Sequence, residues 1–84
     1  MNNEEKYEYF IDICDTGSIT RAAEKHYISQ PAMSKYIANL ETELGTRLIN
    51  RKAGHLSITK AGEIYLNFAK ETFENYKKMK SEVE

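Results

Sequence analysis

Residues 17–41, GSITRAAEKHYISQPAMSKYIANLE, contain two short amphipathic segments separated by a break at residues 27–29. Apolar side chains recur at helical spacing in both segments, and Ser18 and Ser29 are residue types that cap helix N-termini. Isolated helices this short are not stable in water, so each must bury its apolar face against another element. The small pair Ala22–Ala23 permits a close crossing. The stretch therefore predicts two helices joined by a tight turn.

The flanking residues predict three further elements. Tyr7, Phe10, Ile11 and Cys14 form an apolar stripe, so a first helix is expected over residues 3–15. Residues 47–59 alternate in polarity around Gly54, which is typical of a short β-hairpin. Thr59 then caps a last, long helix that runs from residue 60 to about residue 80. The expected fold is mainly α, a winged helix-turn-helix of three helices and a hairpin, followed by a long C-terminal helix.

The net charge of −1 conceals an uneven distribution along the 84 residues. Residues 1–17 carry five acidic residues and one basic residue, whereas residues 18–62 carry seven basic and three acidic residues, a balance of +4. Residues 63–84 carry five acidic and four basic residues. Because local charge governs electrostatic attraction, the basic middle segment is compatible with a polyanionic partner.

Composition also indicates the cellular compartment in which the chain occurs. The one cysteine, Cys14, has no partner for an internal disulfide, which fits a reducing compartment. No apolar run approaches the roughly 18 residues that a membrane helix needs, and the acidic N-terminus is unlike a secretory signal. We therefore expect a cytoplasmic protein without a membrane partner.

The first turn of the second helix of the pair carries side chains that can read DNA. Gln30 can pair with adenine, Lys35 can reach guanine or phosphate, and Pro31 and Ala32 can contact a thymine methyl group. The free N–H groups at the starts of both helices suit phosphate oxygens. The pattern predicts that this helix enters the major groove of double-stranded DNA.

With its flanks, this stretch resembles the LysR-type transcriptional regulators. The matching residues are Phe10, GSITRAAE (17–24), ISQPAMSKYIANLE (28–41), ELGTRL (43–48), Arg51, SIT (57–59) and AG (61–62). The resemblance implies a winged DNA-binding domain over residues 1–59, with the helix-turn-helix at about 19–38, and a linker and dimerisation helix over residues 60–84. Because such regulators normally continue into an effector-binding domain, we expect a fragment or truncated form. A small-molecule effector is expected only if that domain exists.

The resemblance implies DNA contacts from three elements. They are Ser18, Thr20 and Arg21 in the first helix of the pair, Gln30, Pro31, Ser34 and Lys35 in the recognition helix, and Arg51, Lys52, His55 and Thr59 around the wing. Two positions depart from the family pattern. His26 stands where leucine is usual, and Gly54 stands where the wing usually has a basic residue, a role expected to pass to Lys52 or His55.

The apolar positions of the last helix form a face wider than one small domain needs. The residues expected on a homodimer interface are Leu66, Ala69, Phe73, Tyr76 and Val83. The alternative is that this face is intrachain core.

Three polar or reactive groups invite other interpretations. His26 is favoured as a partly buried structural histidine over a pH switch or metal ligand, because no second His or Cys lies at ligand spacing. Cys14 is favoured as a small core residue over an oxidant sensor. Glu41 and Glu43, near Arg47, are expected to be solvated or ion-paired. No metal or cofactor is expected.

Two other classes of function compete with sequence-specific DNA binding. One is a protein-interaction winged helix that pairs with a full-length regulator. An enzyme is the weakest alternative, because the sequence offers no nucleophile–base pair, metal-ligand cluster or phosphate-binding loop.

Overall fold

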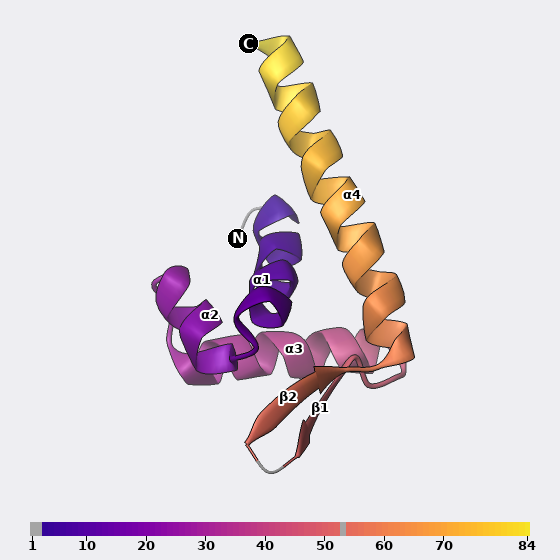
Figure 1. Cartoon of the computed structure of the whole chain (residues 1–84). Helices are drawn as coiled ribbons and strands as arrows, with labels where there is room; N and C mark the ends of the chain where they lie inside the picture. Colours follow the sequence, from indigo (N-terminus) through magenta and orange to yellow (C-terminus); the bar gives the residue numbers. More distant parts are fainter. Residues whose placement is uncertain (1–2, 53) are drawn as a thin grey trace.

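The computed structural model describes residues 3–52 and 54–84 (Figure 1). In chain order the elements are α1 (Asn3–Thr16), α2 (Ile19–Lys25), α3 (Gln30–Leu44), β1 (Ile49–Lys52), β2 (His55–Ile58) and α4 (Lys60–Val83). The two strands form an antiparallel hairpin, so the predicted winged helix-turn-helix with a long last helix is confirmed. Among the described residues, no helix has the length and apolarity to cross a membrane.

The elements form a compact head with one projecting helix (Figure 1). α1 and α2 lie over α3, and the hairpin extends below α3 on the opposite side. α4 passes α1 with its N-terminal half and then extends beyond the head. The first turn of α3 and the wing are thus left open to one side.

Helix ends follow the local signals of the sequence. The caps are Ser18 for α2, Ser29 for α3 and Thr59 for α4, and each side-chain oxygen accepts a backbone N–H three residues on, at 3.0, 3.2 and 3.0 Å. α3 ends at Gly45, whose φ of 71° is the left-handed conformation that glycine adopts without strain. The predicted caps are therefore confirmed.

The core lies where α1, α2 and α3 meet. Its largest fully buried side chains are Phe10, Ile13, Met33 and Leu48. Ala22 and Ala23 are 0% and 1% exposed, which confirms that small side chains let α2 cross closely.

The expected apolar stripe of α1 was partly wrong. Tyr9 and Ile13 are buried with Phe10, whereas Tyr7, Ile11 and Cys14 are only half-buried. The reason is that α1 is covered by α2 on one side and by α4 on another, so its buried face is not one narrow stripe.

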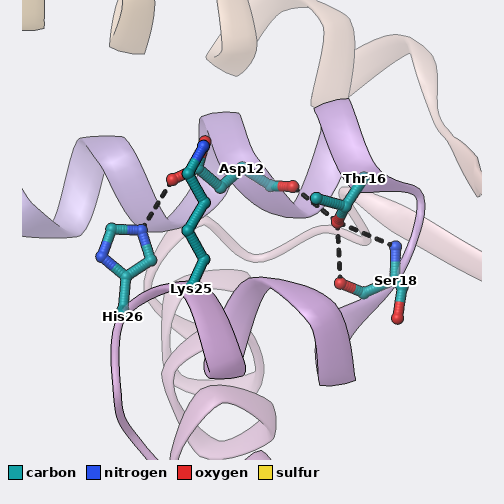
Figure 2. Close-up of polar contacts among 5 residues, drawn as sticks. All are labelled: Asp12, Thr16, Ser18, Lys25 and His26. Atoms are coloured by element: carbon teal, nitrogen blue, oxygen red, sulfur yellow. Dashed lines mark hydrogen bonds and ion pairs between the residues drawn. The ribbon is translucent and has the colours of Figure 1, made fainter.

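A buried carboxylate joins α1 to the end of α2 (Figure 2). The Asp12 side chain is 5% exposed; its Oδ1 lies 3.0 Å from Lys25 Nζ and its Oδ2 lies 2.7 Å from His26 Nε2. The hydrogen bond to Asp12 raises the pKa of Lys25. His26 is thus partly buried, as expected, and its partner comes from another helix.

The wing is joined to α4 without a spacer. The Thr59 hydroxyl donates to the Arg47 carbonyl at 2.7 Å, and the Thr59 N–H donates to the Leu48 carbonyl at 3.0 Å. Gly62, in the first turn of α4, is packed so closely that a Cβ there would lie 2.1 Å from the Leu48 carbonyl oxygen. A side chain at position 62 would therefore push α4 away from β1.

We predict that Gly62→Ala lowers the free energy of unfolding by about 1–3 kcal/mol, because the clashing atom belongs to the backbone and cannot rotate away. Urea unfolding followed by circular dichroism measures this difference. Asn67→Ala, an exposed change on the same helix, should stay within about 0.5 kcal/mol of the parent. Equal stability of the two variants would contradict the assignment.

Candidate nucleic-acid interface

The first turn of α3 presents a polar surface on a helix that is anchored from behind. Met33 and Ile37 are buried, whereas Gln30, Pro31 and Lys35 are exposed. Anchoring by the two apolar side chains fixes which face of α3 points outward. The exposed face is the one that carries the predicted base contacts.

Gln30 and Ser34 lie one helical turn apart and contact each other. Gln30 Nε2 donates to Ser34 Oγ at 2.7 Å, and Ser34 is half-buried. A side-chain amide has two hydrogens and an acceptor oxygen, so Gln30 keeps one donor and its acceptor for another partner. The contact with Ser34 fixes the orientation of the Gln30 amide and leaves part of its hydrogen-bonding capacity unused.

The start of α2 is held against the end of α1 (Figure 2). Thr16 Oγ1 lies 2.7 Å from the Asp12 carbonyl oxygen and 2.9 Å from that of Ser18, and it accepts the Ser18 N–H at 3.2 Å. Thr20 and Arg21 are exposed, and Ser18 is half-buried. The start of α2 therefore has a fixed backbone and exposes the side chains of Thr20 and Arg21 to solvent.

The wing has two faces of different character. The register pairs Arg51 with Leu56 and Lys52 with His55. Side chains alternate along a strand, so Arg51 shares the inward face with buried Ile49, whereas Lys52 and His55 lie on the other face. All three basic residues are exposed.

A hollow of about 310 Å³ separates α3 from β1. Two arginines, Arg47 and Arg51, line it together with Ser34 and Glu41. Arg47 was not among the predicted DNA contacts. Its signal in the sequence is its positive charge just before the strand that carries Arg51.

Glu41 differs from expectation, because it is neither simply solvated nor ion-paired. One of its oxygens, Oε2, accepts the backbone N–H groups of Leu48 and Ile49 at 2.7 and 3.2 Å. The chain reverses at Gly45, so the last turns of α3 lie beside the start of β1. Glu41 thereby ties the wing to α3.

Thr59, another predicted contact, uses its hydroxyl within the fold. It accepts the Gly62 N–H and donates to the Arg47 carbonyl. Thr59 therefore fixes the base of the wing.

The apolar residues of α4 divide into two faces. Ala69 is fully buried, Leu66 packs against the core, and Phe73 and Tyr76 are half-buried. The exposed apolar side chains are Ile64, Phe68, Met79 and Val83, at 62%, 50%, 50% and 74%. At 100° per residue, these lie on one side of Ala69, at about 40° to 140° around the helix from it.

A groove of about 850 Å³ adjoins the exposed face of α4. Its apolar lining includes Tyr7, Leu40 and Leu44 with Ile64 and Phe68. The Tyr7 and Phe68 rings meet edge to face with centroids 5.6 Å apart. Exposed apolar side chains gathered around a groove are a feature of interaction sites.

Cys14 has the character expected of a core residue. It is half-buried against the core, and burial raises the pKa of its thiol to about 11. Since the thiolate is the reactive form, this environment disfavours oxidant sensing at neutral pH.

Comparisons with known proteins agree with this geometry. The family model described as bacterial regulatory helix-turn-helix protein, lysR family, matches residues 5–63. The transcriptional regulator CysL of Bacillus subtilis is 40% identical over 74 residues, covering 88% of this chain and 25% of CysL. The nitrogen assimilation regulatory protein Nac of Escherichia coli is 41% identical over 68 residues, covering 81% of this chain and 22% of Nac. The chain thus spans about a quarter of the length of these relatives.

Solved structures with the same arrangement include complexes with DNA. The DNA-binding domain of BenM with catB site 1 DNA superimposes with a TM-score of 0.90 at 32% identity, covering 98% of this chain and 92% of that one. The corresponding CbnR complex gives a TM-score of 0.88 at 26% identity, with 98% and 94% coverage.

We predict that Glu41→Ala destabilises the fold by about 1–3 kcal/mol, because two wing N–H groups lose their shared acceptor. Urea unfolding measures the loss, and faster hydrogen exchange at the Leu48 and Ile49 amides locates it. Glu43→Ala, which removes an exposed carboxylate nearby, is the control and should change stability by less than about 0.5 kcal/mol. Unaltered exchange at both amides would refute the role of Glu41.

Proposed function

The chain belongs to the LysR family of bacterial helix-turn-helix regulators, and we propose that it binds double-stranded DNA sequence-specifically, with the first turn of α3 in the major groove. The observation that carries this proposal is the exposed polar turn at Gln30 to Lys35 beside a hollow lined by Arg47 and Arg51. Base edges and phosphates then meet different side chains of one continuous surface.

Base reading falls to the exposed start of α3 in this proposal. Gln30 keeps a donor and an acceptor, the pair that bidentate contact with adenine needs. Pro31 presents apolar surface suited to a thymine methyl group. Ser34 contributes by orienting the Gln30 amide.

Phosphate contacts surround that turn on both sides. Ser18, Thr20 and Arg21 supply donors at the start of α2. On the wing side the donors are Lys35, Arg47, Arg51, Lys52 and His55. Arginine and lysine contacts to phosphate fix the position of a protein on DNA without reading its sequence.

We also propose a homodimer formed through α4. Ile64, Met79 and Val83 are exposed apolar residues on one face of this helix, next to the apolar groove. A second copy would cover them, and its recognition helix would reach a second half-site.

We propose that the chain binds DNA and catalyses no reaction. We also propose that it acts in the cytoplasm. The relatives found are transcriptional regulators, and none of the contacts assigned above requires a bond to be made or broken.

Selection from random DNA followed by titration of two variants tests the DNA proposal. Gln30→Ala should cost about 1–3 kcal/mol on the selected site and leave a scrambled duplex nearly unaffected, because its lost contact is to a base. Lys35→Ala should weaken both duplexes and reduce the log–log salt slope by about one per protomer, because its lost contact is to phosphate.

The titrations also identify failure. If Gln30→Ala weakens both duplexes equally, α3 does not read bases through this residue. If selection enriches no sequence, the chain is better described as a protein-interaction winged helix.

For the dimer, we predict that Ile64→Glu combined with Met79→Glu yields a monomer with weaker DNA binding, since two carboxylates would enter an apolar contact. Sedimentation velocity measures the change. Lys70→Gln with Ser81→Glu changes the net charge by the same amount on the opposite side of α4 and should leave the dimer intact. A parent chain that sediments as a monomer at high micromolar concentration would overturn the prediction.

A further inference from the structure

We propose that Glu8, Asp12 and His26 form a binding site for a divalent transition-metal ion of the zinc class, at the junction of α1 with the end of α2. Each residue offers one ligand atom, and these atoms all lie within 4.8 Å of one another. His26 points from the end of α2 towards Asp12 on α1, so the site bridges two elements (Figure 2).

The donor set and its spacing suit such an ion. Glu8 and Asp12 are four residues apart on α1, so their carboxylates lie on one helical face. One imidazole nitrogen and two carboxylate oxygens form a ligand set that zinc and its neighbours accept, and three protein ligands leave a position for water. The sequence has no second His or Cys at ligand spacing from His26. In the folded chain, two carboxylates of α1 supply the remaining ligands instead.

The charges around the site favour a cation. Lys25 is paired with Asp12, but Glu8 forms no ion pair within residues 3–52 and 54–84. Two carboxylates therefore face one ammonium group. The Lys25 side chain is 58% exposed, so its ammonium can turn into water when a metal ion takes its place beside Asp12.

Occupation of the site would act on the helix-turn-helix itself. His26 directly follows α2, and the turn that leads into α3 comes next. A metal ion would bond this point to α1, so it would stabilise the folded chain by binding it in preference to the unfolded chain. This inference does not depend on the proposed DNA binding.

Lys25 distinguishes a metal site from a cluster that serves only as an ion pair. If the lysine competes with a metal ion for Asp12, Lys25→Met should increase the affinity for the ion. If Asp12 serves only to pair with Lys25 and His26, the same variant loses an ion pair and gains no affinity.

The experiment is a titration of the full chain with Co²⁺, followed by visible absorption, and with Zn²⁺, followed by the melting temperature, in a buffer without chelators. We expect one ion per chain and a melting temperature that rises with metal concentration. Glu8→Gln and His26→Leu should each weaken Co²⁺ binding at least about tenfold. Glu8 is only half-buried, so Glu8→Gln is the variant that leaves the fold least disturbed.

His55→Leu is the matched control, because His55 is the other of the two histidines in the chain and lies on the wing. It should bind Co²⁺ like the parent, and Lys25→Met should bind it more tightly. Absence of Co²⁺ bands in the parent, equal binding by His26→Leu and the parent, or weaker binding by Lys25→Met would each overturn the proposal.

Discussion

The close crossing at Ala22 and Ala23 is the constraint on which the interface depends. Both side chains are buried, and the approach of α2 to its neighbours sets the direction in which α3 leaves the turn. Larger side chains would push the helices apart and rotate the first turn of α3. The polar surface at Gln30 is therefore oriented by residues that belong entirely to the core.

The wing is positioned by a separate group of short-range contacts. Glu41 holds the start of β1, Thr59 holds the base of the hairpin, and Gly62 allows α4 to approach Leu48. None of these contacts involves the hairpin tip. These contacts hold Arg47 and Arg51 beside α3. They are needed because a hairpin with strands of only four residues has little stability of its own.

The sequence predicted the elements and caps well because both follow local rules, such as helical spacing and a hydroxyl before a helix. It did not predict the Asp12–His26 contact or the role of Glu41, because each joins residues whose proximity arises only after packing. The face of α4 is an intermediate case. Its apolar width was visible, but only the position of α1 separates buried Ala69 from exposed Ile64.

The direct passage from β2 into α4 has a mechanical consequence. Thr59 belongs to neither element, yet its hydroxyl bonds both the first turn of α4 and Arg47, just before β1. Together with the close approach of Gly62 to Leu48, these bonds couple the orientation of the hairpin to that of α4. Because Leu66 and Ala69 of the same helix pack inside the molecule, a change in the direction of α4 would shift the core and the arginines beside α3 together.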